Sequence, residues 1–139
     1  MSKPSSVRVA PQKGVYIDSA PFWQGLEKGK LMIQRCATTG QYQWHPCPVS
    51  IATSRRSVEW KAVGGKGTIY AYTVVRIAGK GLEGRLPLAV ATVELDEGTR
   101  IIANMLNCRI DEPKIGDRVR LVMDKLDETH NYPAFELDR

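Results

Sequence analysis

The chain has 139 residues, of which 42% are hydrophobic and 25% charged, a composition that is typical of globular proteins and excludes a disordered chain. A chain of this length can bury a core without disulfides or metal ions, and it suits one domain or a domain with a small appendage. Its net charge of +5 permits an anionic partner such as nucleic acid, anionic lipid or the phosphates of coenzyme A, and does not choose among them.

The first part of the chain predicts a flexible arm and then a short helix. Residues 1–15 contain serine, proline, lysine and glycine without periodicity, as flexible arms do. Asp18 or Ser19 can cap the helix that follows, where Pro21 suits the first turn, and Gly29 ends it. Its apolar side either packs on the domain or contacts a partner. The candidate partner-binding residues are Phe22, Trp23 and Leu26.

Residues 31–63 predict a small three-stranded appendage. Residues 31–35 and 41–44 form a hairpin, and residues 57–63 supply a third strand. The segment between them has the outline of a zinc ribbon, whose Cys-x-x-Cys knuckles each aim two thiolates at one tetrahedral metal. The ligand positions would be Cys36, Thr39, Ser50 and Thr53, and only the first is a cysteine. We therefore expect no bound zinc, and a ribbon held by packing instead.

The rest of the chain predicts a five-stranded barrel. The strands are expected at residues 67–77, 87–95, 99–107, 118–126 and 132–137. In the fourth of them Val119, Leu121 and Met123 alternate with mostly polar residues. Five antiparallel strands without a long helix indicate a small barrel, for which the OB fold is the natural candidate. The predicted chain is thus mainly β, with helix and ribbon in residues 16–63 and the barrel in residues 64–139.

No catalytic set stands out in the sequence. The two histidines fall in different modules, and no serine has a His and Asp partner at a triad spacing. The cysteines are an odd number, so we expect reduced thiols, and no basic pattern marks one as a nucleophile. No apolar run approaches the roughly 20 residues of a membrane span, and the start lacks the apolar segment of a signal peptide. We expect a cytoplasmic protein without membrane contact.

An OB-fold barrel with a basic pI could also bind single-stranded nucleic acid, and this is the alternative function. That role needs exposed aromatic side chains on the second and third strands and a basic groove. Residues 87–95 contain neither an aromatic nor a basic residue, and residues 99–107 contribute only Arg100. Tyr70 and Tyr72 could stack on bases but are better explained by packing. The sequence therefore ranks nucleic acid second.

The order and spacing of short motifs along residues 16–137 carry a family resemblance. The motifs include Pro21-Phe22-Trp23-Gln24-Gly25-Leu26, Gln34-Arg35-Cys36, Gly65-Lys66-Gly67-Thr68-Ile69-Tyr70 and Val93-Glu94-Leu95-Asp96-Glu97-Gly98. With them the chain resembles the DUF35 family, OB-fold proteins with an N-terminal rubredoxin-like zinc ribbon. It departs from that family at the metal site, where Thr39, Ser50 and Thr53 replace cysteines.

The resemblance implies a non-catalytic accessory subunit of an acyl-CoA-processing complex, most often with a thiolase-fold partner. It implies that the helix and ribbon help to dock the partner and that the barrel helps to complete an acyl-CoA site. Lysine and arginine would bind the CoA phosphates there. The candidates are Lys66, Arg76, Lys80 and Arg85, near the ends of the first two barrel strands. A CoA ester would be a ligand shared with the partner, and a free-standing acyl-CoA carrier is a weaker possibility.

Overall fold

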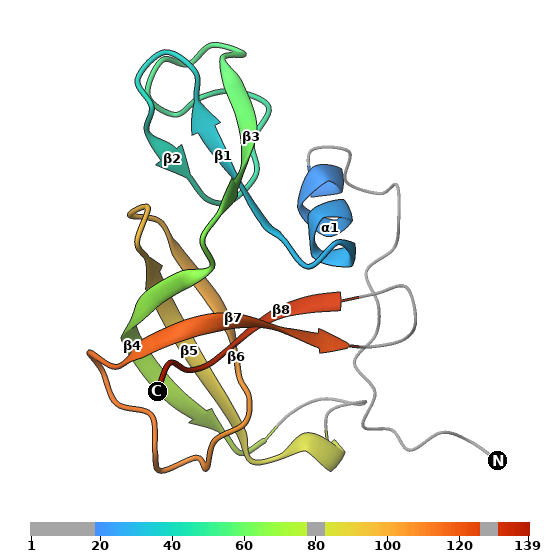
Figure 1. Cartoon of the computed structure of the whole chain (residues 1–139), viewed down its shortest axis with the longest axis vertical. Helices are drawn as coiled ribbons and strands as arrows, with labels where there is room; N and C mark the ends of the chain where they lie inside the picture. Colours follow the sequence, from blue (N-terminus) through green and yellow to red (C-terminus); the bar gives the residue numbers. More distant parts are fainter. Residues whose placement is uncertain (1–18, 78–82, 126–130) are drawn as a thin grey trace, which may run out of the picture.

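The computed structural model describes residues 19–77, 83–125 and 131–139, and its elements follow one another as a helix, a small sheet and a barrel (Figure 1). Helix α1 spans Ala20–Glu27. The small sheet contains β1 (Leu31–Cys36), β2 (Tyr42–Gln43) and β3 (Val58–Val63). The barrel contains β4 (Lys66–Val75), the 3-10 turn η2 (Glu83–Arg85), β5 (Leu88–Leu95), β6 (Arg100–Met105), β7 (Arg118–Lys125) and β8 (Asn131–Leu137). The predicted mainly β class is confirmed.

Helix α1 begins and ends where the sequence predicts. Ser19 takes the N-cap position, Pro21 lies in the first turn, and Gly29 follows the last turn with a φ of +75°. A left-handed residue after a helix is normally glycine, because other side chains are strained there. A β-carbon at Gly25 would collide with the side chain of Met32, so this glycine lets the helix pack closely on β1. No helix in the described ranges has the length and hydropathy needed to cross a bilayer.

The barrel is closed, with strand order β4-β5-β6-β8-β7. Closure comes from pairing of β4 with β7, in which Gly67 lies opposite Val119. One pair differs from the antiparallel prediction, because β6 and β8 run parallel, with Asn104 opposite Ala134. This parallel pair arises because β8 first forms a hairpin with β7 and then closes the sheet against β6. The order and the closure confirm the predicted five-stranded OB-fold barrel.

Alternate residues of the barrel strands fill its interior. The innermost side chains, each at most 3% exposed, are Ile69, Ala91, Val93, Leu95, Ile101, Val119, Ala134 and Phe135. The alternation seen in the sequence of β7 places Val119 in the core, with Leu121 and Met123 packed against it. Asp124 departs from the predicted pattern: it is 8% exposed because Arg85 of η2 forms a 2.7 Å ion pair with it.

Helix α1 joins the ribbon sheet to the barrel. Phe22 contacts Trp44 of the ribbon, with ring centroids 4.7 Å apart. Trp23 meets Tyr132 of β8 edge-to-face at 5.1 Å, and Asn131 Nδ2 donates to the carbonyl of Leu26 at 2.8 Å. The covalent link between the sheets is the pair Gly64–Gly65, which lies between β3 and β4. The chain thus has one continuous core that runs from the ribbon through the helix into the barrel.

Candidate functional site

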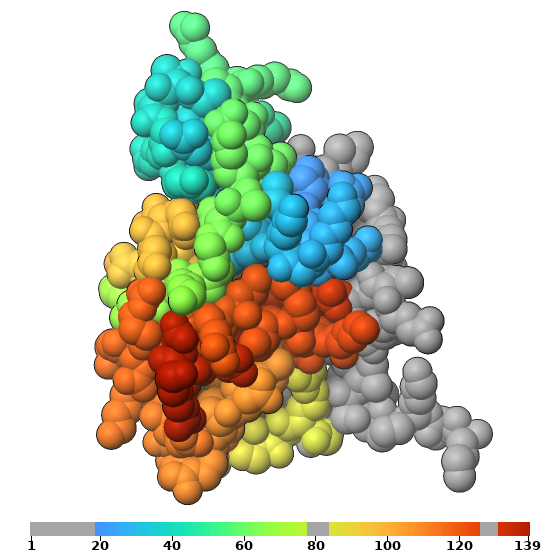
Figure 2. Space-filling view, in the orientation of Figure 1, coloured from blue at the N-terminus to red at the C-terminus, as the bar shows by residue number. Residues whose placement is uncertain are grey.

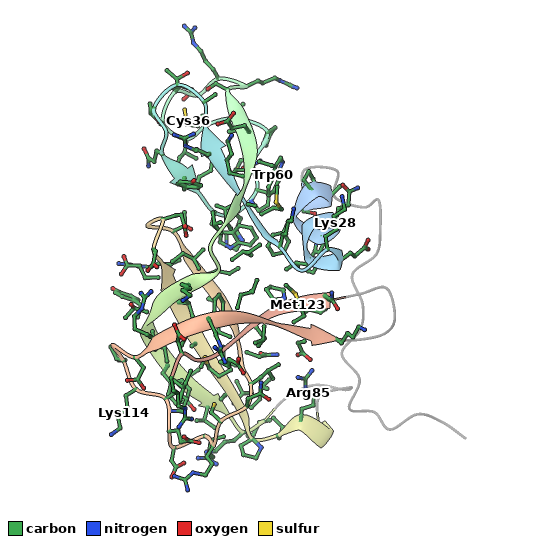
Figure 3. All side chains as sticks on the ribbon, viewed as in Figure 1. Lys28, Cys36, Trp60, Arg85, Lys114 and Met123 are labelled. Carbon is green, nitrogen blue, oxygen red and sulfur yellow. The ribbon has the colours of Figure 1, made fainter. Side chains whose placement is uncertain are left out.

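The four remnant ligand positions of the ribbon assemble around one thiol. Cys36 ends β1 and is 1% exposed, and Ser50 is fully buried on the loop that leads to β3. The backbone N–H of Thr39 donates to Cys36 Sγ at 3.4 Å, and Ser57 Oγ lies 3.8 Å from the same sulfur. Thr53 Oγ1 and Ser57 Oγ share a 3.0 Å hydrogen bond. We call these five residues the hydroxyl cluster; Figure 3 labels its cysteine at the ribbon end remote from the barrel.

Hydrogen-bond donors of this cluster lower the pKa of Cys36 from 9.0 to about 6. The hydroxyl of Ser50 contributes most, followed by the hydroxyl and backbone N–H of Thr39, whereas burial acts in the opposite direction. Donors favour the charged form of an acid because they solvate its negative charge. At neutral pH the cluster therefore holds a thiolate that is solvated by protein groups.

The donor set of the cluster does not fit zinc. Structural zinc sites use four ligands drawn from cysteine, histidine and carboxylate side chains. Here one thiolate faces three neutral hydroxyls at the ligand positions, and the described ranges contain no group of three or more His, Cys, Asp and Glu side chains that could hold a metal ion. Cys47 does not supply a second thiolate to the cluster, because its thiol donates to the carbonyl of His45 at 3.4 Å.

Two buried glutamines hold the long loop of the ribbon. Gln34 on β1 and Gln43 on β2 are 2% and 3% exposed and lie opposite each other. Gln34 bonds both the N–H and the C=O of Cys47, each at 2.8 Å. Gln43 donates to the carbonyl of Val49 and accepts from the N–H of Ile51. Hydrogen bonds thus supplement the packing that the sequence predicts for the ribbon, and the glutamines were missed because their polarity suggests solvent exposure.

The predicted partner-binding residues of the helix divide into two groups. Phe22 and Leu26 are 4% and 0% exposed, so a partner cannot reach them while the helix stays packed. Trp23 is half-buried and packs against Phe22 and Tyr132. The apolar side of the helix therefore packs on the domain, and of the three only Trp23 presents part of its surface.

The structure separates Lys66 from the other predicted CoA-binding residues that it describes, whereas Arg76 and Arg85 both lie close in sequence to the paired residues Val75 and Leu88. Lys66 begins β4, and Arg76 follows its last residue. Since a strand rises about 3.3 Å per residue, the ten residues of β4 separate them by about 30 Å. Arg85 lies on the far side of the barrel from the ribbon (Figure 3) and is paired with Asp124, and Lys66 lies 3.7 Å from Asp138. Lys80 is outside the described residues.

The barrel is a poor platform for nucleic acid. The guanidinium of Arg100 lies 3.6 Å from the ring centroid of Tyr70 and also pairs with Glu94. Tyr72 donates its hydroxyl to the carbonyl of Ile110 at 2.6 Å and packs against the core. Residues 64–139 contain 11 Lys and Arg against 12 Asp and Glu, a net charge of −1. The basic pI therefore does not come from the barrel.

Comparison with known proteins identifies relatives over most of the chain. The C-terminal OB-fold domain of ChsH2 matches residues 60–124, and the rubredoxin-like zinc ribbon domain of ChsH2 matches residues 23–49. A DUF35 domain-containing scaffold protein of Methanocaldococcus jannaschii is 30% identical over 109 residues, which are 76% of this chain and 77% of that protein. A probable enoyl-CoA hydratase alpha subunit of Thermomonospora curvata is 30% identical over 135 residues, which are 96% of this chain and 41% of that protein.

A solved structure is similar over almost the same extent. A chain of the Ltp2-ChsH2(DUF35) aldolase superposes on this chain with a TM-score of 0.82 and 27% identity, covering 91% of this chain and 98% of that chain. This chain therefore spans most of the scaffold protein and of the solved chain, but less than half the length of the hydratase subunit.

Proposed function

The chain belongs to the DUF35 family, and from this premise we propose that it is a non-catalytic accessory subunit of a cytoplasmic acyl-CoA-processing complex with a thiolase-fold enzyme as its partner. The observation that carries the proposal is the match to the Ltp2-ChsH2(DUF35) aldolase across 91% of the chain. Relatives named as a scaffold protein and as an enoyl-CoA hydratase alpha subunit support the same class of assembly.

The electrostatics of the described residues support an accessory role. The pKa of Asp96 is lowered by Arg118, which bonds both of its carboxylate oxygens. The pKa of Glu136 is lowered first by Asn107 and then by Arg120. Each of these shifts arises from ion pairs and hydrogen bonds on the barrel surface, Arg118 with Asp96 and Arg120 with Glu136. Such pairs stabilise strands, and they give no acid or base for catalysis.

A CoA-binding role for the barrel remains part of the proposal, with fewer candidate residues. Lys66 and Arg85 are engaged by Asp138 and Asp124, so a CoA phosphate would have to displace a carboxylate from each. Arg76 is exposed and, within the described residues, has no ion-pair partner. Arg76 is therefore the described candidate that is free to meet a CoA phosphate, in a site whose other wall belongs to the partner enzyme, and Lys80 stays a candidate from the sequence alone.

The test is purification of the tagged chain from its native cells, with nuclease added, followed by mass spectrometry and an acyl-CoA activity assay. Recovery of an acyl-CoA enzyme in near-stoichiometric amount, with activity that falls when the chain is removed, is expected. A thiolase-fold enzyme would identify the partner class. Recovery of no such enzyme would overturn the proposal, and salt-dependent binding of oligonucleotides would then favour the nucleic-acid alternative.

A further inference from the structure

Net positive charge belongs to the helix and ribbon rather than to the barrel. Residues 16–63 contain six Lys and Arg against three Asp and Glu, a net charge of +3, whereas the barrel has −1. Most barrel cations of the described ranges are already neutralised by ion pairs. These are Lys66, Arg85, Arg100, Arg109, Arg118, Arg120 and Arg139. Within the described ranges Arg76, Lys114 and Lys125 stay without ion pairs on the barrel, but they lie at separate positions of the chain.

Within the ribbon, the unneutralised charge gathers at one end. Arg35 and Lys61 lie 3.4 and 3.8 Å from the carboxylate of Glu59. Arg55 and Arg56 are both exposed, and in the described part of the chain neither forms an ion pair. They precede β3, at the end of the strand opposite the barrel. Since β3 has six residues, this end is about 20 Å from the junction at Gly64.

The loop that carries these arginines has a fixed backbone. The N–H of Ser50 donates to the carbonyl of Arg55, and the N–H of Ser54 donates to the carbonyl of Ser50, both at 2.8 Å. The N–H of Arg55 donates to Thr53 Oγ1 at 3.3 Å. The arginines are therefore presented from a preorganised loop, which lowers the entropy lost when a partner binds.

An exposed aliphatic residue lies on the same loop. Ile51 is 64% exposed, and its backbone N–H is held by Gln43 Oε1 at 2.9 Å. Arginine beside exposed apolar surface is characteristic of protein interfaces, whereas a phosphate site needs no aliphatic side chain. In Figure 2 this end of the ribbon stands clear of the barrel and forms a protrusion. We call Ile51, Arg55 and Arg56 the ribbon tip.

We propose that the ribbon tip docks on an acidic surface of the partner enzyme. Arg55 and Arg56 bind carboxylates of that surface, and Ile51 packs on the apolar atoms between them. Charge complementarity favours an acidic partner surface, because the net charge of +3 on residues 16–63 attracts acidic groups and repels basic ones. The inference rests on the proposed function and deepens it by naming the docking surface.

The test uses the complex isolated with the wild-type chain, because the enzyme recovered there becomes the binding probe. Affinity for that enzyme is then measured for the double variant Arg55→Glu/Arg56→Glu. The matched control is Lys114→Glu/Lys125→Glu, which makes the same charge change at two exposed barrel positions without ion pairs among the described residues. All four residues are exposed, so the unfolding midpoint should hardly change in either variant.

The expected result is a loss of affinity of about tenfold or more for the ribbon-tip variant and less than about twofold for the control. Ile51→Ser should also weaken binding while leaving the charge unchanged. Equal binding by the wild type and the ribbon-tip variant would overturn this proposal alone, and so would an equal loss in the control. If the ribbon tip binds nucleic acid or lipid instead, the docking surface fails alone. If no acyl-CoA enzyme accompanies the wild type, the proposed function and the docking surface both fail.

Discussion

Replacing Ser50 with alanine tests whether hydrogen bonds of the hydroxyl cluster stabilise this ribbon in place of a metal ion. Its hydroxyl is fully buried, accepts from the N–H of Ala52 at 3.1 Å and is the strongest single influence on the pKa of Cys36. Removing a buried hydroxyl and leaving its partners unsatisfied costs about 1–3 kcal/mol. Because Ala52 is exposed, water can replace part of the loss, so we expect about 2 kcal/mol.

The loss should depend on pH. Cys36 has a pKa of about 6 in the folded chain and an ordinary value of 9.0, so its ionisation stabilises the folded state. That contribution is complete above the ordinary value and disappears as the pH falls through about 6. Since the Ser50 hydroxyl is the main cause of the shift, Ser50→Ala should destabilise the chain more at alkaline pH than below pH 6.

Urea unfolding followed by tryptophan fluorescence would measure this at pH 5 and at pH 9. The control is Ser54→Ala, which makes the same substitution at an exposed position of the same loop and should stay within about 0.5 kcal/mol of the wild type. An equal loss for Ser50→Ala at the two pH values would refute the thiolate, and a loss no larger than that of Ser54→Ala would refute the cluster.

Three further predictions concern the metal site, the helix and the barrel. The variant Thr39→Cys/Ser50→Cys/Thr53→Cys should bind one zinc ion and unfold at a higher urea concentration when zinc is present. Its free energy of unfolding should rise by about 4 kcal/mol at zinc a thousandfold above Kd. Stoichiometric zinc binding by the wild type would contradict the conclusion that its donor set does not fit zinc. Trp23→Ala should lower the free energy of unfolding by about 2–3 kcal/mol, because it removes ring contacts with Phe22 and Tyr132. An unchanged unfolding midpoint would mean that Trp23 serves partner binding and not the fold. Arg85→Ala should cost about 2 kcal/mol by stranding the carboxylate of Asp124, and Arg85→Ala/Asp124→Ala should recover part of that loss. If the losses of Arg85→Ala and Asp124→Ala simply add up to the loss of the double variant, the pair is uncoupled.

The sequence predicts most of the backbone of this protein, because alternation and turn residues are local signals. The strand bounds lie close to those expected, and the knuckle positions Thr39 and Ser50 lie beside Cys36, with Thr53 joined to it through Ser57. What it does not predict are partnerships between distant residues. Gln34 bonds a loop 13 residues away, and Arg85 finds Asp124 at a separation of 39.

The contacts of helix α1 were also beyond what the sequence could predict. Periodicity identifies the apolar side of α1 but does not say what covers it, and in the structure the ribbon and β8 cover it. The charge distribution was equally hidden. The net charge is visible in the composition, but the neutralisation of barrel cations depends on pairs such as Arg118 with Asp96, which are 22 residues apart.

The bridge made by α1 has a mechanical consequence. The linker Gly64–Gly65 would act as a hinge if it were the only connection, but the carbonyl of Gly65 is bonded by the N–H of Leu121 at 2.7 Å, and the helix clamps the ribbon through Phe22 and Trp44. The ribbon and the barrel should therefore tumble in solution as one rigid body. A protein bound at the remote end of the ribbon and a ligand bound against the barrel would then be kept at a fixed distance from each other.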